Sequence, residues 1–160
     1  RNGLSCLRMN AACWHGLQRY NNMAHSYLIY QRILDETLEA EINADIQSLR
    51  AEAYLDLNML GRGDDPDNVV ARAIEWRVYQ PTMFMIGMGE PNRNTLEHIF
   101  AEGNGMGGEH SPLVVEHICK HPNLSVGDLV VGLSGTKSVH VCMPMGWHEF
   151  YNYRLLLVGE

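Results

Sequence analysis

The apolar positions in the first part of the chain recur about every four residues. From Ala24 onward they are Ile29, Ile33, Leu38, Ile42, Ile46 and Leu49, with acidic residues between several of them. Residues three or four positions apart lie on one face of a helix, so this spacing predicts an amphipathic helix. We expect it to begin near Ser26 and to continue to about Leu57, until the glycines and the proline of residues 61–66 end it. Residues 1–63 are therefore predicted to be mostly helical.

The pattern changes after residue 63, where short apolar or alternating runs replace the four-residue spacing. Asp65 before Pro66 predicts an N-cap and a short helix over residues 67–73. Asn94 likewise predicts the cap of a helix over residues 95–101. The segments with the composition of strands are residues 74–78, 82–88, 113–119, 126–133, 138–143 and 150–158.

These elements predict an α+β fold in which an N-terminal helical region packs on a mostly antiparallel β-sheet. A chain of 160 residues is long enough for one domain with a real core and short for two. We therefore expect a single domain over residues 1–160, with a mixed and largely β part over residues 64–160.

The charge of the chain excludes some classes of partner. The net charge is −7, and acidic residues outnumber basic ones from Asp64 onward, which argues against a surface that binds nucleic acid. The longest apolar runs, such as residues 155–158, are too short to span a membrane. The sequence thus predicts a soluble protein that acts on a small molecule or peptide, and self-association stays open.

The compartment is not fixed by the sequence. The chain opens at Arg1 without Met, so we expect a processed form or a fragment. Its four cysteines are too few for a disulfide-dense scaffold, which slightly favours the reducing cytoplasm. A bridge between Cys6 and Cys13 is the alternative in an oxidising compartment.

Histidines crowd the last third of the chain. Six of the eight histidines lie at or beyond His98, together with Cys119 and Cys142. Imidazole and thiolate are the side chains that best hold a transition metal. The crowding therefore predicts a metal site, and its candidate ligands are His98, His117, Cys119, His140, Cys142 and His148.

The predicted helix over residues 95–101 contains the candidate catalytic residue. Asn94 and His98 lie one turn apart on a helix, with Glu97 beside them. A carboxylate next to a metal-binding histidine can act as general acid or base, which is the role predicted for Glu97. The alternative is a structural one, with Asn94 as the cap, Glu97 in solvent and His98 partly buried.

A family resemblance points in the same direction. The zinc helix of the S-ribosylhomocysteine lyases is similar to residues 95–101, which read TLEHIFA, and the flanking segments RVYQP (77–81) and PMG (144–146) resemble the family in the same order. The resemblance implies zinc-dependent chemistry with Glu97 and His98 in their family roles. Asn94 replaces the first metal-binding histidine of the family, and Trp147 replaces its reactive cysteine.

Two further clusters suggest other ligand sets. The segment with His140, Cys142 and His148 resembles the copper loop of cupredoxins, in which a thiolate and imidazoles select copper. On a strand, His117, Cys119 and His121 would share one face. We therefore predict a zinc-dependent hydrolase or lyase with Glu97 as general acid or base; a copper electron-transfer protein and a non-catalytic interaction subunit are the alternatives.

Overall fold

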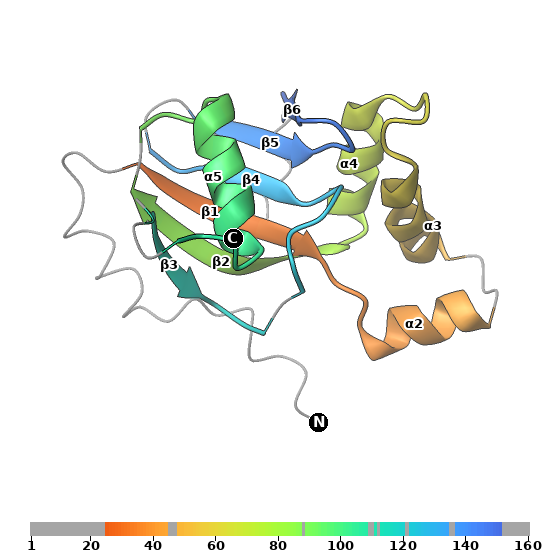
Figure 1. The fold of residues 1–160 in the computed structure, drawn as a ribbon. Coiled ribbons are helices and arrows are strands. Elements are labelled where there is room, and N and C mark those ends of the chain that lie inside the picture. The colour runs from red at the N-terminus through yellow and green to blue at the C-terminus, as the bar shows by residue number, and fades with distance from the viewer. Residues whose placement is uncertain are drawn as a thin grey trace.

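Six antiparallel strands form one sheet, which is the framework of the fold (Figure 1). The computed structural model describes residues 25–44, 48–87, 89–108, 111, 113–120, 122–134 and 137–151. The strands are β1 (Ser26–Arg32), β2 (Tyr79–Gly87), β3 (Leu113–His117), β4 (Leu129–Gly132), β5 (Ser138–Cys142) and β6 (Trp147–Phe150). Their order across the sheet is β3-β2-β1-β4-β5-β6, so β3 and β6 lie at opposite edges.

The described helices occupy the connections on either side of β2. Between β1 and β2 lie α2 (Glu36–Asn43), α3 (Leu49–Asp56), the 3₁₀-helix Leu57–Met59 and α4 (Pro66–Glu75), and α5 (Arg93–Gly103) follows β2. The predicted α+β fold with a largely antiparallel sheet is confirmed. In the described part of the chain, no helix combines the length and the apolar character needed to cross a membrane.

The prediction of one long helix from Ser26 to Leu57 is wrong, because residues 26–32 form β1 and the helical residues after it are divided between α2 and α3. This strand lies between β2 and β4, and its two faces contact different layers of the fold. Tyr27, Leu28 and Ile29 are all buried in succession. A strand that is covered on both faces reads as a continuous apolar run rather than an alternation, so the spacing from Ile29 onward was mistaken for helical periodicity.

The other predicted elements are mostly confirmed, with shifted ends. The cap at Asp65 and the short helix after it are confirmed as α4, but α4 continues to Glu75 and the predicted strand over 74–78 is wrong. Arg77, with a φ of 53°, turns the chain between α4 and β2. The predicted cap at Asn94 is also wrong, since Asn92 Oδ1 accepts a hydrogen bond from Thr95 N at 3.1 Å.

The predicted C-terminal strand lies only partly within the described residues. β6 ends at Phe150 and residues 152–160 lie outside the described part, as do Cys6 and Cys13 of the predicted bridge. The strands predicted over 113–119, 126–133 and 138–143 are confirmed as β3, β4 and β5.

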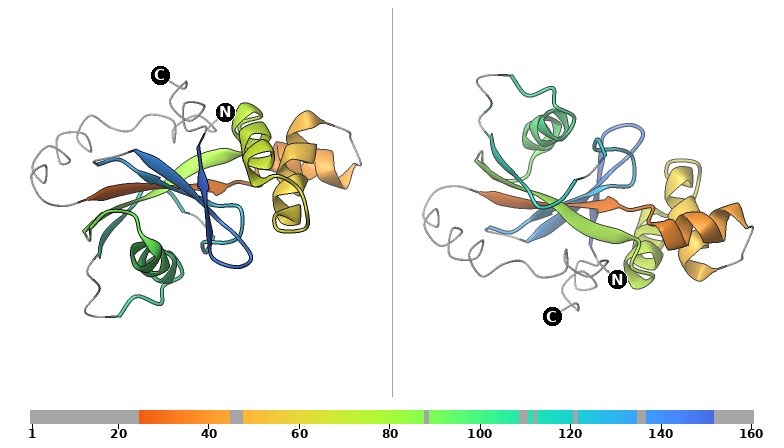
Figure 2. Two further views of the ribbon diagram at one scale, coloured as in Figure 1. Left: turned by 90° about the horizontal axis from the view of Figure 1, so that it is seen from above. Right: turned by 90° about the horizontal axis from the view of Figure 1, so that it is seen from below.

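The core consists of one apolar layer on each face of the sheet. On one face, Leu96 and Ile99 of α5 pack on β1, β2 and β4. On the other, Val69, Val70 and Ala73 of α4 pack on β4, β5 and β6. Figure 2 shows α5 and α4 on opposite sides of the sheet. Because successive residues of a strand point to opposite faces, this arrangement fixes which β5 residues meet which helix.

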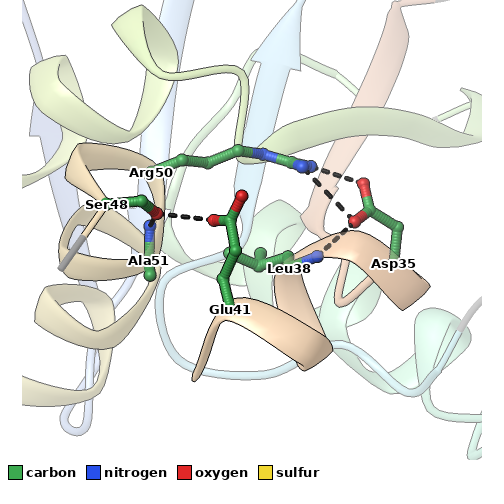
Figure 3. A network of polar contacts seen from close by, with 6 residues as sticks. All are labelled: Asp35, Leu38, Glu41, Ser48, Arg50 and Ala51. Atoms are coloured by element: carbon green, nitrogen blue, oxygen red, sulfur yellow. Dashed lines mark hydrogen bonds and ion pairs between the residues drawn. The ribbon is translucent and has the colours of Figure 1, made fainter. Parts of the chain in front are cut away.

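A polar network joins α2 to α3 (Figure 3). Asp35 caps α2 by accepting from Leu38 N at 2.8 Å and forms an ion pair with Arg50 of α3, whose Nη2 lies 2.6 Å from Asp35 Oδ2. Ser48 caps α3 and donates to Glu41 Oε2 at 2.5 Å. The hydrogen bond from Arg50 is the largest cause that lowers the pKa of Asp35.

A buried polar cluster fastens the segment before β4 to β1. Gln31 Nε2 donates to Asp128 Oδ2 at 3.0 Å and to the carbonyl oxygens of Pro122 and Asn123, both at 3.2 Å. Thr82 Oγ1 donates to Gln31 Oε1 at 2.9 Å. Gln31, Thr82 and Asp128 are almost fully buried, so these hydrogen bonds replace the water that the groups have lost.

Candidate functional site

The order of the strands separates the three predicted ligand clusters. His117 ends β3, at the opposite edge of the sheet from the β5–β6 hairpin. β2, β1 and β4 lie between β3 and β5, so the two clusters are roughly 19 Å apart at about 4.8 Å per strand. Cys119 lies just beyond β3, where its Sγ is 3.8 Å from the carbonyl oxygen of Pro81. His117 and Cys119 therefore do not meet the candidate ligands of β5.

The β5–β6 hairpin divides its own candidate ligands between the two faces of the sheet. His148 pairs with Val141 and lies on the face covered by α4, where its Nε2 is 2.8 Å from Asp67 Oδ1. His140 and Cys142 alternate with Val141 and hence lie on the opposite face, with α5.

The remaining predicted ligands do not complete a site either. His98 is exposed on α5, about 100° around the helix axis from Glu97. His121 lies outside the described residues. Within the ranges that the structure describes, no three His, Cys, Asp or Glu side chains are grouped so that they could hold a metal ion. Zinc or copper at these positions stays a prediction.

One set of side chains does come together, on the face of the sheet where α5 crosses in front of β5 and β4 (Figure 1). We call it the β5–α5 face, and its members are Glu97, Phe100, Ser138, His140, Cys142, Trp147 and Glu149. The register pairs Cys142 with Trp147 and His140 with Glu149. The rings of Phe100 and Trp147 meet edge to face, with centroids 6.4 Å apart and an interplanar angle of 81°. This contact joins α5 to β6.

Two polar atoms on this face are buried without a hydrogen-bond partner among the described residues: Ser138 Oγ and His140 Nδ1. Both side chains belong to β5 and point to the same face, since they are two residues apart. Pro91, in the segment between β2 and α5, lies close to this point, because a Cβ added to Gly132 would be 3.1 Å from Ser138 Oγ and 3.7 Å from Pro91 Cγ. Native proteins pair nearly all buried polar atoms with a hydrogen-bond partner. Two unpartnered atoms on the same face of one strand therefore mark a place where a further group belongs.

The protonation states on this face follow from burial and from nearby carboxylates. Burial lowers the pKa of His140, and the charge of Glu149 opposes this shift, so the imidazole is neutral at pH 7. Burial, followed by the charges of Asp128 and Glu97, raises the pKa of Cys142 to about 12. The thiol therefore stays protonated, which makes it a poor nucleophile at neutral pH.

The sequence predicted three of these seven residues, Glu97, His140 and Cys142, and missed Phe100, Ser138, Trp147 and Glu149. The signal for Trp147 and Glu149 is the segment PMG (144–146), which makes the short connection between β5 and β6. A tight turn between two strands fixes which residues face each other, and this pairing places Trp147 beside Cys142 and Glu149 beside His140.

Comparison with known proteins adds no family to this description. The family models gave no match to the chain, and the searches of curated proteins and of solved structures gave none either.

Proposed function

We propose that the β5–α5 face is an acid–base site of a hydrolase or lyase that acts on a small molecule or peptide. The observation that carries the proposal is the pair of buried, unpartnered polar atoms, Ser138 Oγ and His140 Nδ1. The Cα atoms of residues two apart on a strand are separated by roughly 6.6 Å, which is close to twice the length of one hydrogen bond. A single substrate atom between the two side chains would therefore bond to both.

His140 supplies the base in this proposal. When its proton is on Nε2, Nδ1 accepts a proton from an O–H or N–H group of the substrate or of a water molecule, and the resulting imidazolium returns the proton to the leaving group. Glu149, which faces His140 across the strand pair, favours the imidazolium because its negative charge opposes the effect of burial. A lowered pKa keeps the imidazole in its basic form at neutral pH.

Glu97 and Cys142 have supporting roles. Glu97 is exposed on α5, and its negative charge is one of the causes that raise the pKa of Cys142. It is therefore the second group able to carry a proton to or from a bound molecule. The Cys142 thiol is protonated and makes a weak contact of 3.9 Å to the Met143 carbonyl oxygen, so it forms part of the floor of the site rather than its nucleophile.

The hydrolysis of p-nitrophenyl acetate between pH 6 and pH 9 tests the proposal. Wild-type protein is compared with His140→Ala and His140→Gln, and His98→Ala is the matched control, since His98 is an exposed histidine of α5. General-base catalysis typically contributes about 10²–10⁴-fold, so both His140 variants should lose at least about tenfold of the protein-catalysed rate while His98→Ala keeps it. Equal rates in wild type and in a folded His140 variant would refute the acid–base role.

A further inference from the structure

We propose that the β5–α5 face binds a primary alkylammonium group, so that the substrate of the acid–base site is an amine. This inference rests on the proposed function, because the ammonium group would supply the N–H that donates to His140 Nδ1. The probe for the inference is n-propylammonium, a primary amine with a short apolar stem.

The two unpartnered atoms favour a ligand with several donors on one atom. Ser138 Oγ and, with the proton on Nε2, the Nδ1 of a neutral His140 are acceptors on the same face of β5. An ammonium nitrogen carries three donors and no lone pair, so it can donate to both atoms and still donate to a third acceptor. With the His140 proton on Nε2, a carboxylate or phosphate oxygen has no proton to give to Nδ1, whereas an ammonium group does.

The charges around the two atoms favour a cation. In the described part of the chain, the charge acting on His140 is that of Glu149, and those acting on Cys142 are Asp128 and Glu97. Arg93, one turn before Glu97 on α5, is not among the causes of either shift. Glu149 pairs with His140 across the two strands, and the charges that act on both side chains are those of carboxylates, which attract a positively charged ligand.

A fourth carboxylate, that of Glu90, acts near the Ser138 end of the face. Tyr27 pairs with Gly132, which pairs with Ser138. Burial and then the charge of Glu90 raise the pKa of Tyr27 to about 12. Glu90 therefore adds negative charge at Tyr27 on β1, two strands from Ser138.

The aromatic pair provides a place for the apolar stem and a favourable neighbour for the charge. Trp147 is half-buried and lies beside Cys142, two residues from Glu149 on the same face of β6. Its ring contacts Phe100, which is three residues from Glu97 on α5. Cations are attracted to the faces of aromatic rings, and Trp is the most effective of these rings. Carboxylates and an aromatic pair around two lone-pair acceptors form a set suited to an alkylammonium ion.

Binding is measured by NMR, from the Cε1–H signal of His140, while n-propylammonium chloride is added at constant ionic strength. n-Propanol is the control ligand, because it has the same stem and no charge. We expect a saturable shift with the amine and a linear or absent response with the alcohol. Glu97→Gln and Glu149→Gln should each weaken binding by at least about threefold, whereas Glu52→Gln, an exposed carboxylate on α3, should leave it unchanged.

The outcomes separate this inference from the proposed function. If the amine gives no saturable shift, or if propanol binds equally well, the ammonium ligand is wrong, and the effect of His140→Ala on ester hydrolysis still decides the acid–base site. If the amine binds but Glu97→Gln and Glu149→Gln bind it as wild type does, the site of recognition is elsewhere and the inference is overturned. Ser138→Ala, which adds no bulk, should weaken amine binding without lowering the helix signal in circular dichroism.

Discussion

Replacing Asp128 with alanine removes the acceptor at the centre of the buried polar cluster. Its Oδ2 accepts from Gln31 Nε2 at 3.0 Å and from Ser125 N at 2.8 Å, and its Oδ1 accepts from Arg32 N at 3.3 Å. Asp128 itself is 1% exposed, so water does not take over these donors without a local opening of the structure. Gln31 keeps its contacts to two carbonyl oxygens, whereas the two backbone N–H groups lose their acceptor.

The magnitude follows from these contacts. A buried donor left without an acceptor costs about 1–3 kcal/mol. Two backbone donors are affected, and one of them, Arg32 N, gives up only a long hydrogen bond. Removing a buried carboxylate also removes its own desolvation, which offsets part of the loss. We therefore expect Asp128→Ala to lower the free energy of unfolding by about 2–4 kcal/mol.

Urea denaturation followed by circular dichroism at pH 7 measures this loss, with Asp64→Ala as the control, because Asp64 is exposed before α4. Burial raises the pKa of Asp128 above 3.8, so the folded chain holds this proton more tightly than the unfolded chain. The contribution of Asp128 to stability is full below 3.8 and falls as the pH rises through its native pKa. The difference between wild type and variant should thus be larger at pH 4 than at pH 7. A loss below about 1 kcal/mol at pH 7, or a difference that grows with pH, would refute the reasoning.

The remaining predictions concern a helix cap, a close contact and a thiol. Asp35→Ala should cost about 1 kcal/mol, mainly through the lost cap of α2, since the pair with Arg50 is partly exposed and screened by solvent. Because the pKa of Asp35 is lowered, this contribution is present above pH 3.8 and lost as the pH falls through the native pKa, so the cost seen in urea should shrink towards pH 2. Gly103→Ala should lower stability by about 1–3 kcal/mol, because the added Cβ would lie 2.0 Å from Leu124 Cδ1, whereas Gly108→Ala meets no atom within 4 Å. Cys142 should react with iodoacetamide at pH 8 at least about tenfold more slowly in folded than in urea-unfolded protein, as measured by peptide mapping; equal rates would contradict its burial and raised pKa.

Several elements were predictable from the sequence, and the central strand β1 was not. The Asp65 cap, the helix that contains Glu97 and the strands β3, β4 and β5 each carry a local signal that the fold leaves intact. β1 was missed because its residue Ile29 continues the spacing of about four residues that Ile33, Leu38 and Ile42 show after it. A strand of this kind is specified by partners distant in sequence, which a local pattern cannot reveal.

The sequence also could not reveal which of the candidate ligands lie close together in the fold. Histidines that crowd one third of the sequence are dispersed in space, because β3 and the β5–β6 hairpin are at opposite edges of the sheet. Within the β5–β6 hairpin, the register determines which side chains share a face of the sheet. It pairs Val141 with His148, which places His148 on the α4 face, and it pairs His140 with Glu149 on the α5 face.

The register also bears on the predicted copper loop, which needs Cys142 and His148 on one face. A shift of β6 by one residue would bring His148 to the side of Cys142, but it would also turn Phe150 out of the layer that it fills with Val139 and Val141. Phe150 is 1% exposed, and exposing a buried aromatic side chain of this size costs about 1.5–3 kcal/mol, while the contact between Phe100 and Trp147 would be lost as well. Apolar packing on the α4 face thus holds the β5–β6 hairpin in the register that brings His140 and Glu149 together.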